Sequence, residues 1–257
     1  MNKCQYQGKV ISNTKITSCI YHLCIDCSQV IKKVKPGQFV HVRVGEGLDP
    51  FFRRPFSVFR ASKNLEILYE VVGPGTKILS LKGRGDILDI IGPLGNSFSL
   101  PSKHIKKVVM IAGGIGVAPF LAFSDFLKSR KDCEMVLLYG GRNKEHTFSM
   151  KVFKDNGCKV FVATDDGSVG VKGRVSSLYD KIQPNGQMTQ IYTCGPKSMM
   201  RSVQEYAKKH KISGEASCEE VMACGVGVCL GCAIKVANGM KMVCSDGPVF
   251  DLQEVVF

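Results

Sequence analysis

Four cysteines near the C-terminus have a spacing that could hold an iron–sulfur cluster. Four, two and eleven residues separate them in turn, and they are Cys224, Cys229, Cys232 and Cys244. A C-x4-C-x2-C run with a distant fourth cysteine is the plant-type ligand pattern of a [2Fe–2S] cluster. Glycines at positions 225, 227 and 231 stand between these cysteines, and glycine lets a backbone approach sulfur atoms closely. We therefore expect the four thiolates to bind a [2Fe–2S] cluster.

Zinc is the main alternative for such a group of thiolates. Structural zinc sites usually contain two short C-x2-C pairs, whereas here three cysteines lie close together and the fourth stands alone. Cys218 falls outside the spacing, and Cys24 and Cys27 form a pair that has no second pair, so we assign none of them to a metal. The remaining cysteines are scattered, and we expect them to be small buried apolar residues: Cys4, Cys19, Cys133 and Cys158.

Two stretches in the first hundred residues could bind phosphate. In Arg53-Arg54-Pro55-Phe56-Ser57 a rigid proline fixes an arginine next to a strand, and a serine hydroxyl lies nearby. Gly73-Pro74-Gly75-Thr76 is a turn that opens a helical pattern, and free N–H groups at a helix start attract anions. Either stretch alone could be an ordinary basic strand start or helix N-terminus. The presence of both favours a phosphate-bearing cofactor.

Glycine-rich turns also recur in the second half of the chain, each after an apolar run. They are Gly113-Gly114-Ile115-Gly116-Val117-Ala118-Pro119, Gly140-Gly141-Arg142, Thr164-Asp165-Asp166-Gly167 and Cys194-Gly195-Pro196. The first turn departs from the G-x-G-x-x-G fingerprint and is a weak signal alone. Ligands of parallel sheets bind at the carboxyl ends of the strands, so together these turns predict a dinucleotide pocket. Arg142 could accept a 2′-phosphate, and the residues leave NAD or NADP open.

The elements that must position these residues fall into two kinds. Short stretches rich in Val, Ile and Phe, separated by turn signals, predict six strands of a small antiparallel barrel, at residues 5–15, 20–26, 38–44, 56–60, 65–72 and 86–91. From residue 106 strands alternate with helices, which predicts a parallel sheet, with strands at 108–112, 135–139, 159–163 and 190–193 and a helix at 197–210. The expected fold is thus a β-barrel plus an α/β domain.

We expect three parts along the chain: a barrel domain at residues 1–100, a nucleotide-binding α/β domain at 101–212 and a small cluster-binding segment at 213–257. The 257 residues carry a net charge of +13, from 35 basic and 22 acidic side chains. The basic residues are spread along the chain, so we expect a solvated surface and no nucleic-acid partner. No apolar run approaches 18 residues and no signal segment is evident, so we expect a cytoplasmic protein without membrane contact.

Together these motifs resemble the ferredoxin reductase superfamily, and most closely the electron-transfer subunits of NAD-linked dihydroorotate dehydrogenases. The resemblance covers essentially the whole chain, and its most specific piece is MACGVGVCLGC with VCSDGPVFD. It implies an FAD site made by Arg54, Pro55, Phe56, Ser57, Val71, Val72, Gly73, Gly75 and Thr76. It also implies an NAD site made by Gly113, Gly114, Gly116, Pro119, Cys194, Gly195 and Pro196.

The resemblance implies a partner as well as cofactors. A nicotinamide moves two electrons at once, an iron–sulfur cluster moves one, and a flavin does both, so FAD would stand between the other two. The partner would be an FMN-containing catalytic subunit that oxidises dihydroorotate in pyrimidine biosynthesis, in a heterotetramer with two copies of each subunit. Related subunits of NAD(P)H:ferredoxin transhydrogenases and sulfide dehydrogenases share much of the pattern. Some of these replace one cluster cysteine with aspartate, whereas all four are cysteine here.

Two functions from other classes compete with this interpretation. A carrier or assembly protein could bind nucleotide and metal without redox turnover. A nucleic-acid-binding protein would use the basic surface, and its binding would depend strongly on salt. A redox subunit, in contrast, should be coloured as purified and should bleach with NADH.

Overall fold

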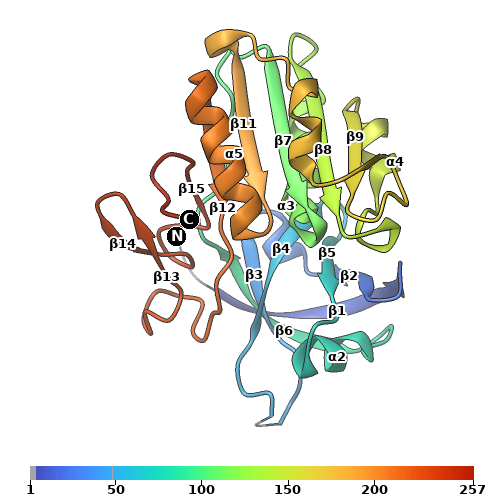
Figure 1. Cartoon of the computed structure of the whole chain (residues 1–257). Coiled ribbons are helices and arrows are strands. Elements are labelled where there is room, and N and C mark those ends of the chain that lie inside the picture. Colours follow the sequence, from blue (N-terminus) through green and yellow to red (C-terminus); the bar gives the residue numbers. More distant parts are fainter. Residues whose placement is uncertain (1–3, 48) are drawn as a thin grey trace.

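The computed structural model describes residues 4–47 and 49–257 and begins with a closed antiparallel barrel (Figure 1). The predicted barrel is confirmed, and its strands run in the order β1-β2-β5-β4-β3-β6. Their bounds are β1 Cys4–Lys15, β2 Ile20–Asp26, β3 Phe39–Arg43, β4 Arg54–Ala61, β5 Leu65–Glu70 and β6 Ile87–Leu94. Two short helices, α1 Ser28–Ile31 and α2 Pro74–Ser80, lie in the connections.

The barrel closes around side chains that alternate along its strands. The buried residues that fill it are mostly β-branched or leucine, and they include Leu23, Ile25, Val40, Val42, Val58, Ile67, Leu88 and Ile90. Inward-facing residues of a small barrel fill its interior, so this barrel has a packed core and its cofactor-type motifs lie at its rim.

The second domain is a seven-stranded sheet with the order β10-β9-β8-β7-β11-β12-β15. All neighbouring strands are parallel except the last pair. The bounds are β7 Lys107–Gly113, β8 Glu134–Gly141, β9 Lys159–Thr164, β10 Val171–Lys172, β11 Thr189–Cys194, β12 Ser213–Ser217 and β15 Val249–Asp251. The parallel sheet is as predicted, but β10, β12 and β15 were not foreseen.

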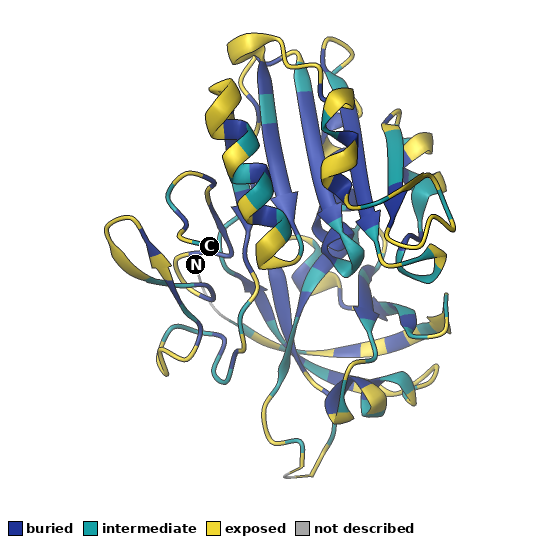
Figure 2. Cartoon of the chain, in the orientation of Figure 1, coloured by how far each residue is buried: buried dark blue, intermediate teal, exposed yellow. Residues whose placement is uncertain are grey.

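Helices cover both faces of this sheet, because the side chains of its central strands alternate in direction. Val108 and Met110 pack with α3 (Ala118–Leu127), on the side that also carries α4 (Met150–Asp155). Val109 and Ile111 pack with α5 (Lys197–His210). Figure 2 shows these strands buried and the outer helix faces exposed. Four short 3-10 helices complete the domain: η1 Gly114–Val117, η2 Lys144–His146, η3 Val175–Lys181 and η4 Gly186–Met188.

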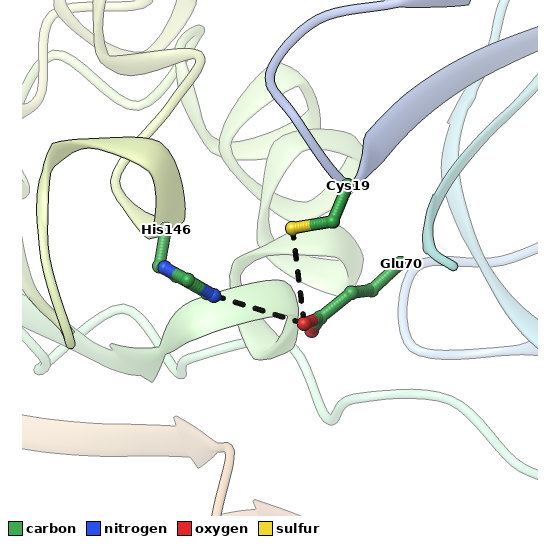
Figure 3. Close-up of side chains that lie close together, drawn as sticks. All are labelled: Cys19, Glu70 and His146. Atoms are coloured by element: carbon green, nitrogen blue, oxygen red, sulfur yellow. Dashed lines mark hydrogen bonds and ion pairs between the residues drawn. The ribbon is translucent and has the colours of Figure 1, made fainter. Parts of the chain in front are cut away.

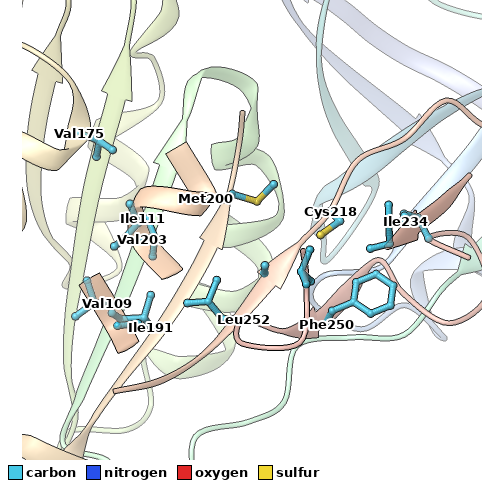
Figure 4. Packing of buried hydrophobic residues seen from close by; sticks show 14 of the residues in the cluster. Val109, Ile111, Val175, Ile191, Met200, Val203, Cys218, Ile234, Phe250 and Leu252 are labelled. Atoms are coloured by element: carbon cyan, nitrogen blue, oxygen red, sulfur yellow. The ribbon is translucent and has the colours of Figure 1, made fainter. Parts of the chain in front are cut away.

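The C-terminal segment packs against both domains. It forms a hairpin of β13 (Ala233–Val236) and β14 (Gly239–Met242) and then returns to the sheet as β15. Figure 4 shows its side chains Ile234 and Phe250 in one hydrophobic cluster with Val109 and Ile191 of the sheet. Phe39 of the barrel belongs to the same cluster. The segment is therefore held by a core that it shares with the rest of the chain.

Across residues 4–47 and 49–257 the helices are too short or too polar for any of them to span a membrane.

Candidate functional site

The structure brings the four cysteines of the C-terminal segment together in one loop region. Cys232 and Cys244 are buried, Cys224 is half-buried and Cys229 is exposed. The backbone N–H groups of Val226, Val228 and Cys229 each donate to Cys224 Sγ over 3.4 Å, and the N–H of Cys244 donates to Cys232 Sγ over 3.4 Å. N–H groups aimed at sulfur are the usual environment of cluster thiolates.

Two of these thiols have pKa values that are shifted in opposite directions. Burial raises the pKa of Cys224, but the three N–H donors outweigh it and bring that pKa down to about 6. Burial and the neighbouring Cys232 thiol raise the pKa of Cys244 to about 12. A thiolate is the form that binds metal, so Cys224 is ready to ligate, whereas Cys244 needs a nearby cation to lose its proton. This donor set fits an iron–sulfur cluster.

The loop lies directly against barrel strand β3. Gly225 has φ +68°, and a Cβ atom there would lie 2.4 Å from Nδ1 of His41. His41 is fully buried, and burial lowers its pKa to about 4, in a position faced by the backbone groups of Arg53 and Cys224. Among the described residues neither ring nitrogen completes a hydrogen bond. His41 was not foreseen, and its only signal was one histidine in the apolar run FVHVR.

The two stretches expected to bind FAD lie in contact at the barrel rim. Arg54 begins β4, and a Cβ atom on Gly75 of α2 would lie 2.7 Å from its Nε atom, so the guanidinium rests on that glycine. Thr76 Oγ1 accepts the N–H groups of Val72 and Gly73 over 3.0 Å and 3.3 Å, which shapes the turn. A cationic side chain beside a helix N-terminus can bind a pyrophosphate.

The other residues of these stretches differ in exposure. Ser57 and Val71 are half-buried and Val72 is exposed, so these three side chains are accessible at the rim. Phe56 is buried, with its ring centroid 5.7 Å from that of Tyr69 in the barrel core. Pro55 pairs with His41 across β3 and β4, which places this stretch beside the cluster loop.

A cavity of about 550 Å³ lies at the carboxyl ends of the sheet strands, where the sequence predicts a dinucleotide. Its lining includes Pro196 and the four glycines that were predicted in the two motifs, Gly113, Gly114, Gly116 and Gly195. A Cβ atom on Gly116 would lie 2.4 Å from the carbonyl oxygen of Cys194, so the two turns touch. Gly114 has φ +54° and nothing within 4 Å of its missing side chain. Such open backbone suits a bound phosphate.

Two residues that were predicted for this site are buried and do not line the cavity. Pro119 is buried in the first turn of α3, and Cys194 is fully buried at the end of β11, where burial raises the pKa of its thiol well above the ordinary value. The lining also contains side chains that sequence reasoning missed, namely Glu70, His146, Arg174, Met199 and Glu219. They come from separate parts of the chain, and no spacing connects them. Arg142 lines the cavity too and pairs with Glu70 over 3.3 Å.

Gly225→Ala should prevent stable cluster binding, because the added methyl group would collide with His41 and the backbone conformation is left-handed. We expect purified Gly225→Ala to hold a small fraction of the wild-type iron, measured by iron analysis and by the cluster's visible absorption. Gly186→Ala is the matched control, since Gly186 also has positive φ (+48°) but nothing within 4 Å. Equal iron content in both variants would contradict the role of this contact.

Two parts of the chain match known family models. Residues 219–256 match the family described as the iron-sulfur cluster binding domain of dihydroorotate dehydrogenase B. Residues 110–205 match the oxidoreductase NAD-binding domain. Among solved structures, an NADH-dependent reduced ferredoxin-NADP oxidoreductase superposes with a TM-score of 0.86 at 30% identity, over 100% of this chain and 91% of that chain. A ferredoxin NADP+ reductase from Neisseria gonorrhoeae, 19% identical with a TM-score of 0.67 over 80% and 91%, shares the fold.

Curated relatives match over nearly their whole length. The chain is 38% identical to a protein of Desulforamulus reducens and 40% identical to one of Caldanaerobacter subterraneus, each over 98% of both chains. Both relatives are named dihydroorotate dehydrogenase B (NAD(+)), electron transfer subunit. With its barrel, nucleotide cavity and cysteine loop, this chain belongs to the family of dihydroorotate dehydrogenase B electron transfer subunits.

Proposed function

We propose that this chain passes electrons between NAD(H), FAD and a [2Fe–2S] cluster, to or from an FMN-containing dihydroorotate dehydrogenase subunit in pyrimidine biosynthesis. The observation that carries the proposal is the contact of the cysteine loop with β3. Gly225 rests on His41, and His41 pairs with Pro55 of the predicted FAD stretch. A cluster and a flavin bound at these motifs would therefore be neighbours.

Each cofactor has its own set of residues in this proposal. The four cysteines hold the cluster, and the N–H groups around Cys224 stabilise its thiolate form. Arg54 and the Gly73–Thr76 turn hold the FAD pyrophosphate, and Ser57 lies at the rim for the flavin ring. The glycine turns from Gly113 and Cys194 hold the NAD phosphates. When bound, FAD would exchange two electrons with nicotinamide and single electrons with the cluster.

The catalytic partner and the assembly are also part of the proposal. The relatives are named as subunits, which supports a separate chain that carries FMN and oxidises dihydroorotate. We propose a heterotetramer with two copies of each chain, located in the cytoplasm, where thiols stay reduced and can ligate iron. Cys229 is exposed on the cluster loop, so this loop is the face that we expect to meet the partner.

A transhydrogenase subunit is a second candidate function, which one structural comparison supports. The 0.86 TM-score and full coverage with an NADH-dependent reduced ferredoxin-NADP oxidoreductase support a related role as the flavin and cluster subunit of a transhydrogenase. The fold is common to both roles. The cognate partner distinguishes them, because only an FMN dehydrogenase would make dihydroorotate a substrate.

Cys232→Ala should abolish the electron paramagnetic resonance signal of the reduced cluster, because it removes a buried ligand. Cys218→Ala is the control, since Cys218 is equally buried but lies outside the spacing, and burial raises its pKa to about 12. We expect a normal signal from this control. A wild-type signal from Cys232→Ala would refute the ligand assignment.

Arg54→Ala should weaken FAD binding, because it removes a charge-assisted contact to the pyrophosphate. Such contacts contribute about 1.5–3 kcal/mol, which corresponds to a loss of affinity of roughly tenfold to hundredfold. Fluorescence titration of the apoprotein with FAD measures it. Lys77→Ala, which removes an exposed cation of the neighbouring helix α2, serves as control. Unchanged affinity in Arg54→Ala would remove this arginine from the site.

The proposed function itself is tested by reconstitution. The purified chain alone should oxidise NADH with ferricyanide but should not oxidise dihydroorotate. Addition of the FMN dehydrogenase from the same organism should produce dihydroorotate-dependent reduction of NAD⁺. Dihydroorotate turnover by this chain alone would overturn the subunit role, and coupling to ferredoxin instead of the FMN dehydrogenase would favour the transhydrogenase.

A further inference from the structure

Three potential metal ligands from both domains meet beside the nucleotide cavity (Figure 3). Cys19 lies between β1 and β2, Glu70 ends β5, and His146 ends η2. Their ligand atoms all lie within 4.8 Å of one another. Cys19 Sγ is 3.9 Å and His146 Nε2 is 3.7 Å from Glu70 Oε1. None of the three is exposed, and none is deeply buried.

The hydrogen bonds around His146 indicate which of its nitrogens carries the proton. Asn143 Oδ1 accepts the N–H of Glu145 over 3.0 Å and lies 2.8 Å from His146 Nδ1. An amide oxygen can only accept, so Nδ1 is the donor in this pair. A neutral ring then presents the lone pair of Nε2 toward Glu70. A ligating histidine is usually oriented in this way, by a hydrogen bond from its second nitrogen.

Three electron-pair donors therefore face one another. At 3.7 Å the His146 and Glu70 atoms are too far apart for an ordinary hydrogen bond, and the sulfur contact at 3.9 Å is weak. With metal bonds of about 2.0 Å to nitrogen or oxygen and about 2.3 Å to sulfur, tetrahedral ligands lie about 3.3 Å apart for a nitrogen–oxygen pair and about 3.5 Å apart for a pair with sulfur. The two distances to Glu70 Oε1, 3.7 Å and 3.9 Å, exceed these values by about 0.4 Å, so a small inward shift of the side chains would let one cation bind all three.

We propose that Cys19, Glu70 and His146 form a binding site for Zn²⁺ at the junction of the barrel and the nucleotide domain. A mixed set of sulfur, nitrogen and carboxylate ligands suits zinc, and three protein ligands leave one position for water. Glu70 and His146 also line the nucleotide cavity, so the bound ion lies at its edge and inhibits oxidation of NADH.

Arg142 is the competing cation at this site. Its Nη2 atom lies 3.3 Å from Glu70 Oε1, but its side chain is 70% exposed and ends in solvent. Exposed ion pairs of this kind are weak, so a zinc ion can displace the guanidinium from the carboxylate. Arg142→Ala should therefore bind zinc more tightly than the wild type.

The test uses the protein loaded with cluster and flavin, and it reads metal binding first. Dialysis against Zn²⁺ followed by metal analysis should find one zinc per chain with the iron content unchanged. Co²⁺ as a probe should give a thiolate-to-cobalt charge-transfer band. Cys19→Ala should lose this band and bind zinc at least about tenfold more weakly. Cys24→Ala, which alters a half-buried cysteine of β2, should behave as the wild type.

Inhibition is the second readout, and it alone rests on the proposed function. Cys19 is absent from the residues that line the cavity, so Cys19→Ala should keep its NADH–ferricyanide activity while losing sensitivity to Zn²⁺. No retained zinc in the wild type, or equal zinc and cobalt binding in Cys19→Ala and Cys24→Ala, would overturn the site. Zinc binding without inhibition would leave the site in place and overturn its proposed effect on NADH oxidation.

Discussion

The position of the cysteine loop is fixed by its contact with strand β3. Gly225 allows the loop to lie against the buried ring of His41, with no room for a side chain between them. Backbone groups of Arg53 and Cys224 face this ring, and burial lowers its pKa to about 4. A neutral, closely packed histidine thus connects the loop to the barrel. The shared hydrophobic cluster in Figure 4 packs the same C-terminal segment against the sheet.

Glycines also allow close contacts between segments at the other two sites. Gly75 makes room for the Arg54 guanidinium, and Gly116 lies against the Cys194 carbonyl. In each place a side chain on the glycine would separate two segments that must meet to form the binding site. Glycine therefore serves here as the residue that lets distant segments converge, and the three sites occupy adjoining parts of one molecule.

Local patterns in the sequence were sufficient to predict much of this arrangement. The cysteine spacing, the strands of the barrel and the glycine turns each depend on neighbouring residues, and the structure has them close to where they were expected. His41, Glu70 and His146 could not be predicted, because their roles come from contacts between segments far apart in the chain. Strands β12 and β15 were missed for a similar reason, since SGEAS and VFD acquire strand structure by pairing with each other and with β11.

We infer that the chain alone connects its cluster to its nucleotide site through FAD. The most direct measurement is to reduce the purified chain chemically, remove the reductant and mix it without oxygen with excess NAD⁺. Loss of the cluster's paramagnetic signal and appearance of NADH are followed together. We expect both in the isolated chain. A reduced FAD holds two electrons and a reduced cluster one, so two chains together hold six electrons and yield three NADH by hydride transfer. A cluster that stays reduced in the presence of excess NAD⁺ would contradict this inference.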